Sequence, residues 1–174
     1  DWKAPETWIS QSRSLYAEWN TTVEQHSGPT TDVPPSYAHV IGAVNRVCDE
    51  TDLALTAAGG FPGELCKNWK TKSSGTFDCE FGFSCMGYEI AGGWGAKMAD
   101  PDRDVIVFVG DGSYLMMNSD IYSSVLTGHK LIVVVCDNGG FSVINRLQNF
   151  KGSVSFNNQI VDSKVERVEY VDFV

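Results

Sequence analysis

The sequence of 174 residues lacks several features that would assign it to common classes of protein. No apolar stretch reaches the ~20 residues that a membrane-spanning helix needs, so we expect no membrane partner. Its five cysteines include no C-x-x-C pair, which argues against a zinc site or a disulfide framework and suits a reducing cytoplasm. There is no internal repeat and no G-x-x-x-x-G-K-[ST] motif, so a Walker-type nucleotide site is not supported.

Basic residues are also scarce. Lysine and arginine number 13 against 22 acidic residues, which gives a net charge of −9. This balance argues against nucleic acid or an anionic membrane surface as a partner. The length predicts one domain, and a chain of this size buries roughly 70% of its unfolded surface when it folds.

Two apolar runs stand out in what the sequence does contain. Residues 105–109 and 131–136 are rich in β-branched side chains without polar alternation, which is typical of strands buried on both faces of a parallel sheet. Residues 114–126 between them are long enough for a crossover helix. A right-handed strand–helix–strand unit brings the two following loops to the same edge of the sheet. Asp111 and Asn138 are therefore expected to lie close in space.

The rest of the pattern extends this unit into an α/β fold. We predict helices over 8–23 and 37–48, a strand over 53–58, a loop over 61–80, a turn and small-residue helix over 81–99, and a helix or loop after Phe141. The predicted fold is a three-layer, doubly wound parallel sheet. Residues 1–35 are predicted to be a linker or arm from a preceding domain and residues 36–174 the binding domain. Because the chain begins without Met and ends in an apolar run, we expect it to be part of a longer polypeptide.

The cysteines receive only structural roles at this stage. Cys136 ends the second apolar strand, and Cys85 is predicted to lie in an apolar helix. Both are positions at which a free buried thiol is ordinary. The segment Gly92–Gly95 lacks the full G-x-G-x-x-G and is not a dinucleotide fingerprint.

The loop after the first apolar strand carries the chemistry. A carboxylate and an amide oxygen, from Asp111 and Asn138, suit a hard divalent cation such as Mg²⁺, which is usually shared with a ligand phosphate. Gly110 and Gly112 let the backbone approach that phosphate, and Ser113 begins a helix whose N–H groups favour an anion. The alternatives are a plain turn after a strand, or a phosphoacceptor site at Asp111, for which no later strand ends in the usual lysine.

The motif resembles that of thiamin diphosphate (ThDP) enzymes, which runs from GDG across about this spacing to a closing Asn pair. Here 25 residues separate Gly112 from Asn138, and Asp137 replaces the first Asn of the pair. The resemblance implies that the carbonyl of Gly140 is the third protein ligand of Mg²⁺. The segment GFSCMG (82–87) is similar to the family segment that meets the aminopyrimidine ring. This implies that the Ser84 carbonyl accepts from the 4′-amino group and that Met86 is the apolar wedge beneath the cofactor, although core packing is the alternative for Met86.

Within that family, four segments together look like the trihydroxycyclohexanedione hydrolases of myo-inositol breakdown. They are GGFPGEL (59–65), FGFSCMGYEIAGG (81–93), GDGSYLMMNSD (110–120) and DNGGFSVINRLQ (137–148). The resemblance implies ThDP- and Mg²⁺-dependent ring opening of a cyclic 1,2-diketone to 5-deoxy-glucuronate in the cytoplasm. The expected cofactor-binding residues are Gly59, Gly60, Ser84, Met86, Gly110, Asp111, Gly112, Ser113, Asn138 and Gly140, and the expected metal ligands are Asp111, Asn138 and Gly140.

Half of the expected active site is not in this chain. In the family, the glutamate that activates the cofactor belongs to the pyrimidine-binding domain of a neighbouring subunit, so a homodimer or tetramer is implied. No role is assigned to Glu64, Lys67, His26, His39 or His129. Two functional alternatives stay open: a ThDP-dependent 2-oxoacid decarboxylase, synthase or lyase, and a ThDP-binding module without catalysis.

Overall fold

The computed structural model describes residues 2–163 and 169–170. It divides the chain into two compact units, residues 1–47 with 68–70 and residues 48–67 with 71–174. The first unit contains α1 (Glu6–His26) and α2 (Tyr37–Val47), which confirms both predicted helices. The Arg46 guanidinium donates to the Ser27 carbonyl at 2.6 Å and ties the end of α2 to the end of α1. No helix in the described ranges has the length and apolarity to cross a bilayer.

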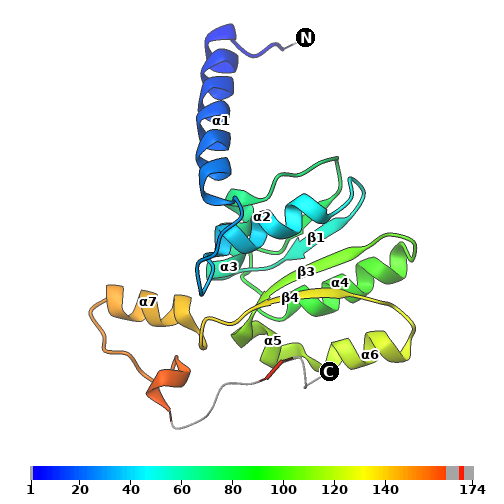
Figure 1. Cartoon of the computed structure of the whole chain (residues 1–174), viewed down its shortest axis with the longest axis vertical. Helices are drawn as coiled ribbons and strands as arrows, with labels where there is room; N and C mark the ends of the chain where they lie inside the picture. The colour runs from blue at the N-terminus through cyan, green and yellow to red at the C-terminus, as the bar shows by residue number, and fades with distance from the viewer. Residues whose placement is uncertain (1, 164–168, 171–174) are drawn as a thin grey trace. The chain divides into compact units, whose positions relative to one another are not determined.

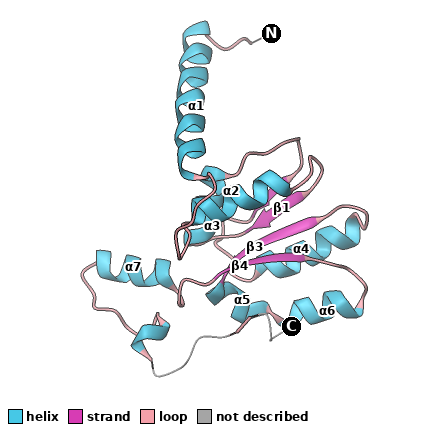
Figure 2. Cartoon of the chain, viewed as in Figure 1, coloured by secondary structure: helices cyan, strands magenta, loops and turns pink. Residues whose placement is uncertain are grey.

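The second unit is built on four parallel strands in the order β2-β1-β3-β4. They are β1 (Leu53–Thr56), β2 (Phe77–Cys79), β3 (Val105–Gly110) and β4 (Ile132–Cys136). The register pairs Val109 with Val135 and Gly110 with Cys136, so β3 and β4 end together, as the sequence predicted. Figure 2 shows β1, β3 and β4 side by side. The prediction of full burial is right for β3 but wrong for β4, which is half-buried because it is the last strand of the described sheet.

Helices cover this sheet on both faces. Alternate residues of β1 and β3 pack with Ile90 of α4 (Tyr88–Ala99), Tyr114 of α5 (Asp111–Met117) and Ile121 of α6 (Ser119–Leu126). These helices lie along one side of the sheet in Figure 1. On the other face, Phe108 meets Phe61 of α3 (Gly60–Asn68) edge to face, with ring centroids 5.9 Å apart. This is the predicted α/β architecture of a parallel sheet between helices.

Three local predictions were wrong. The segment 61–80 is not a loop, because it contains most of α3 and all of β2. Pro62 lies in the first turn of α3, where a helix tolerates proline. Cys85 is exposed in the loop before α4 rather than buried in a helix, because the left-handed conformation of Gly87 (φ +96°) delays the start of α4 to Tyr88. The helix after β3 is divided at Asn118 into α5 and α6.

The end of the chain contains α7 (Ser142–Phe150) and a short 3-10 helix at Ile160–Asp162. The helix expected as one option after Phe141 is therefore present. Cys136 is buried at the end of β4, as predicted. The strand expected at the end of the sequence falls on residues 170–174, of which 171–174 lie outside the described residues.

Candidate functional site

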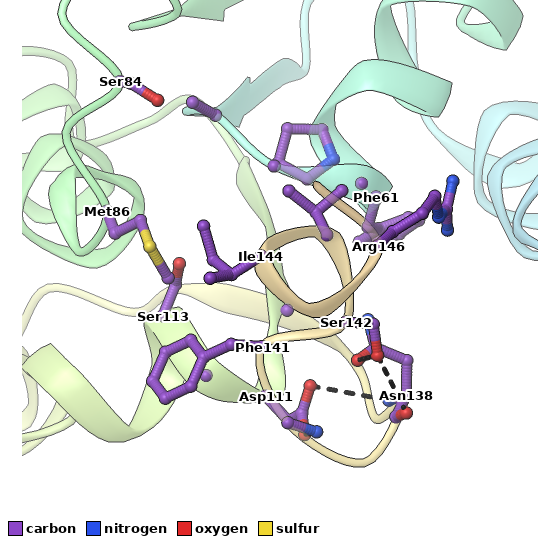
Figure 3. A pocket seen from close by; sticks show the side chains of 18 of the residues that line it. Phe61, Ser84, Met86, Asp111, Ser113, Asn138, Phe141, Ser142, Ile144 and Arg146 are labelled. Carbon is purple, nitrogen blue, oxygen red and sulfur yellow. Dashed lines mark hydrogen bonds between the residues drawn. The ribbon is translucent and has the colours of Figure 1, made fainter. Parts of the chain in front are cut away.

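A cavity of about 480 Å³ opens where the described strands end. Its walls come from the turn after β1 and the start of α3, the loop before α4, the end of β3 and the start of α5, the loop after β4, and α7. Figure 3 shows Asp111, Asn138 and Ser142 together in one part of this cavity and Ser84 and Met86 on another wall. All ten residues predicted to bind a cofactor line it: Gly59, Gly60, Ser84, Met86, Gly110, Asp111, Gly112, Ser113, Asn138 and Gly140.

Asp111 is the charged centre of the site. Its side chain is only 1% exposed at the first position of α5. The carboxylate accepts hydrogen bonds from the backbone N–H groups of Asn138, at 3.4 Å, and Gly140, at 2.5 Å. Burial raises the pKa of Asp111, the two N–H groups oppose that rise, and the charge of Asp137 adds to it. The predicted proximity of Asp111 and Asn138 is therefore observed, and Asp111 ionises less readily than an ordinary aspartate.

The Asn138 amide is held in a fixed orientation. Its Oδ1 accepts from the Ser142 hydroxyl at 2.7 Å, and the same hydroxyl lies 3.2 Å from the Asn138 carbonyl. The Asp137 carboxylate accepts from the Gly139 N–H at 2.9 Å, which shapes the turn between the two predicted ligands. The carbonyl of Gly140 accepts the N–H of Ser142 at 3.0 Å. Ser142, which sequence reasoning missed, thus joins two of the three predicted ligand oxygens.

These oxygens fit a hard cation that takes only a few of its ligands from the protein. The parts of the chain that the structure describes contain no group of three or more His, Cys, Asp or Glu side chains placed to hold a metal. A cation at Asp111 would therefore meet fewer than three such side chains, with the neutral oxygens of Asn138 and Gly140 beside the Asp111 carboxylate. That donor set suits Mg²⁺ shared with ligand phosphates and waters, and it does not suit zinc.

Two glycines of the motifs have a clear steric reason. A Cβ atom on Gly112 would lie 2.7 Å from the Phe141 ring. Gly140 has φ +124°, and a Cβ there would lie 2.6 Å from the Asn158 carbonyl oxygen. The GDG and DNGG segments therefore need glycine to bring the start of α5 and the loop after β4 together.

The loop before α4 forms the wall that contains Ser84 and Met86. The Glu80 carboxylate accepts from the N–H groups of Phe83, at 2.9 Å, and Cys85, at 2.8 Å, and these bonds lower the pKa of Glu80. Ser84 adopts a positive φ of 58°, and its carbonyl accepts the Met86 N–H at 3.1 Å. Met86 is half-buried and faces the cavity rather than the sheet core.

Helix α7 supplies an apolar wall that sequence reasoning assigned to no function. Val143, Ile144 and Leu147 line the cavity, and their spacing along the helix is the signal that could have identified them. Phe141, before α7, and Phe61 and Pro62 of α3 extend this apolar lining. Arg146 is the one basic residue among the described lining residues.

The charged residues left without a role do not line the cavity. Glu64 and Lys67 form an ion pair of 3.0 Å along α3, with side chains 39% and 57% exposed. His129 lies 2.8 Å from the Thr127 hydroxyl, and the N–H of Ser36 donates to His39 at 3.4 Å. His26, at the end of α1, is also not among the described residues that line the cavity.

Comparison with known proteins gives a consistent family. Residues 57–174 match the family model described as thiamine pyrophosphate enzyme, C-terminal TPP binding domain. The chain is 45% identical over 117 residues to a 3D-(3,5/4)-trihydroxycyclohexane-1,2-dione hydrolase of Geobacillus thermodenitrificans (strain NG80-2), covering 67% of this chain and 18% of that protein. For the hydrolase of the same name from Clostridium botulinum (strain Alaska E43 / Type E3), identity is 41% over 122 residues, with 70% and 19% covered. The chain thus spans about a fifth of the length of these relatives.

Proposed function

Because the chain belongs to the family of C-terminal thiamine pyrophosphate-binding domains, we propose that its cavity holds Mg²⁺ and the diphosphate of ThDP within an enzyme that hydrolytically opens a cyclic 1,2-diketone. The observation that carries the proposal is the convergence on one cavity of all ten residues expected from the sequence. The names of the relatives support the substrate, trihydroxycyclohexane-1,2-dione, and the hydrolytic reaction.

In this proposal Asp111, the Asn138 side chain and the Gly140 carbonyl hold the metal ion. The N–H donors on the Asp111 carboxylate favour its ionised form despite burial, so that a divalent cation can bind it. Ser142 keeps the Asn138 amide from rotating. The cation then offsets the negative charge of a diphosphate in a chain whose net charge is −9.

The remaining lining residues position the ligand. The N–H groups of Gly112 and Ser113 donate to the diphosphate, and the Ser84 carbonyl accepts from the aminopyrimidine. Met86, with Ile144 of α7, provides apolar surface that excludes water from the reacting end. When bound, ThDP supplies the carbon nucleophile and the electron sink needed to break a carbon–carbon bond next to a carbonyl.

The rest of the proposed machinery lies outside this chain. A glutamate from the pyrimidine-binding domain of a neighbouring subunit would supply the carboxyl group that activates a bound cofactor, in a cytoplasmic homodimer or tetramer. Water adds to the second carbonyl of the substrate, one end of the opened ring becomes a carboxylate, and the other end becomes an aldehyde. The product is 5-deoxy-glucuronate.

A second candidate is supported by Arg146. This residue lines the cavity, and a guanidinium group suits a substrate carboxylate, which a 2-oxoacid carries and the cyclic diketone lacks. A ThDP-dependent decarboxylase, synthase or lyase acting on a 2-oxoacid is therefore the alternative reaction.

The test is product formation followed by NMR with the full-length protein and Mg²⁺, with and without ThDP. ThDP-dependent release of the ring-opened aldehyde acid from trihydroxycyclohexane-1,2-dione is the expected result. Binding of ThDP without turnover of the diketone, together with consumption of a 2-oxoacid such as pyruvate, would favour the second candidate.

A further inference from the structure

Glu89 is a fully buried acid in the first turn of α4. Its Oε2 atom accepts the N–H of Gly87 at 2.8 Å. Its Oε1 atom is also buried and has no hydrogen-bond partner among residues 2–163 and 169–170. An unsatisfied buried carboxylate oxygen is costly, because the charge has lost its water without gaining a donor.

The position of this carboxyl group relates it to the cavity. Gly87, whose N–H donates to Glu89, directly follows Met86, and Met86 lies on one wall of the cavity. The Ser113 hydroxyl also interacts with the Glu89 carboxyl group. Ser113 is only 4% exposed and lines the cavity two residues after Asp111. Glu89 therefore lies behind the cavity surface and contacts both the Met86 loop and the start of α5.

No cation of the described residues acts on Glu89. Burial raises the pKa of Glu89, and the groups that oppose this rise are its own N–H, the N–H of Gly87 and the Ser113 hydroxyl, with no charged side chain of the described residues among them. Lys97 lies at the other end of α4 and donates to the Arg103 carbonyl at 2.5 Å. Strands β1 and β3 carry no titratable side chain. The remaining titratable side chains on α4, α5 and α6 are Tyr88, Asp111, Tyr114, Asp120 and Tyr122.

We propose that Glu89 is a positioning residue that takes up a proton when a diphosphate binds and that directs the Ser113 hydroxyl into the cavity. This inference rests on the proposed function. Binding turns the Ser113 hydroxyl from Glu89 to a phosphate oxygen, and the loss of this donor, which opposes the rise in the pKa of Glu89, favours the neutral acid. The proton comes from solvent and resides on a carboxyl oxygen that donates to Ser113 Oγ. Ser113 is then free to donate its own proton to a phosphate oxygen.

The sign of the pH dependence follows from this linkage. The loss of the Ser113 donor makes the pKa of Glu89 higher in the complex than in the free protein. Affinity for the diphosphate is therefore greatest below the pKa of the free protein and falls as the pH rises through the pKa of the complex. The decline is about tenfold per pH unit at its steepest. Asp111 gives the opposite dependence, because Mg²⁺ requires its ionised form.

The experiment measures the dissociation constant of Mg²⁺·ThDP by calorimetry from about pH 5.5 to about pH 9.5 with the full-length protein and each variant, so that ionisation of the ligand phosphate is common to all of them. Glu89→Gln mimics the neutral acid, so it is expected to retain the affinity that the wild type has at low pH and to lose the decline as the pH rises. Glu89→Ala is expected to bind more weakly at every pH. The matched control is Glu64→Gln, which removes an exposed carboxylate outside the cavity and should keep the wild-type pH profile.

A measurement on the wild type makes the test independent of the folding of any variant. Binding heats are compared at each pH of this range in HEPES and Tris buffers, and the difference, after subtraction of the protons that the ligand phosphate exchanges, reports protons taken up by the protein. Net uptake is expected. Binding without uptake, or a Glu89→Gln profile that matches the wild type, would overturn this inference and leave the proposed function standing. Absence of Mg²⁺·ThDP binding by the wild type at every pH would overturn the proposed function and the inference together.

Discussion

The carboxylate of Asp111 accepts the backbone N–H of Gly140 at 2.5 Å, although 28 residues lie between the two positions in the sequence. One residue begins α5 directly after β3 and the other follows β4, so this contact joins the start of α5 to the loop after β4 across the edge of the sheet. The N–H group is a fixed donor to a group that is 1% exposed. The loop geometry around Asp111 is therefore formed by the protein alone, which is the preorganisation that a binding site requires.

The first prediction concerns Asp111 as a metal ligand. Asp111→Ala is expected to weaken Mg²⁺-dependent ThDP binding by about 100-fold or more, because it removes the only charged oxygen of the proposed ligand set. Titration calorimetry of the full-length protein with Mg²⁺ and ThDP measures the change. Asp102→Asn, an exposed acid in the turn before β3, is the control and should bind normally. Tight binding by Asp111→Ala would remove Asp111 from the ligand set.

The second prediction separates the two possible roles of Met86. If Met86 is the apolar wedge, Met86→Ala should reduce turnover by about 100-fold through misplacement of the reacting groups, with a smaller effect on cofactor affinity. Turnover, the dissociation constant of ThDP and the unfolding free energy are measured together. Met98→Ala, at an exposed site on α4, is the matched control. A large loss of stability in parallel with activity would show that Met86 packs the core instead.

The third prediction concerns the steric need for glycine. Gly112→Ala should destabilise the protein by about 1–3 kcal/mol, because the new methyl group meets the Phe141 ring at 2.7 Å. Gly63→Ala in α3 places its methyl group where no heavy atom lies within 4 Å and should stabilise the helix by about 0.5–1 kcal/mol. Urea unfolding of both variants provides the comparison. Equal stability of Gly112→Ala and the wild type would show that the Phe141 ring moves aside at little cost.

The fourth prediction concerns the pH dependence of Asp111 without ligands. Its pKa in the folded protein is raised above the ordinary value of 3.8, chiefly by burial. The folded state therefore holds this proton more tightly than the unfolded state. The corresponding contribution to stability is complete below pH 3.8 and is lost as the pH rises through the raised pKa. The pH profile of unfolding should flatten in that range in Asp111→Asn, and an unchanged profile would contradict the assignment.

The sequence predicted the part of the fold in which local pattern and tertiary structure agree. The continuous β-branched runs of β3 and β4 are typical of strands buried in a parallel sheet, so the pattern predicted the strand–helix–strand unit. The glycines and polar residues after these runs identified the cavity edge. The site residues at Ser84 and Met86 came from family resemblance alone, because nothing in their local pattern distinguishes a cavity wall from a core position.

Other features depend on contacts that no local pattern contains. Strand β2 has three half-buried residues, too few for a periodicity, and α3 is obscured by Gly60, Pro62 and Gly63. Tertiary packing decides which side of α7 lines the cavity. One such contact is that of the Val143 side chain with Gly60. The burial of Glu89 was also unforeseen, because a glutamate in the first turn of a helix is usually solvated.

The division of the cavity walls has an evolutionary consequence. The proposed diphosphate cradle occupies residues 110–113 and 138–140, whereas three residues of the apolar wall, Val143, Ile144 and Leu147, come from a single short helix. Substitutions on that helix can reshape the space for a substrate without altering the hydrogen bonds to Asp111. A descendant of this sequence can therefore acquire a new substrate through changes in about one turn of helix while it inherits the cradle intact.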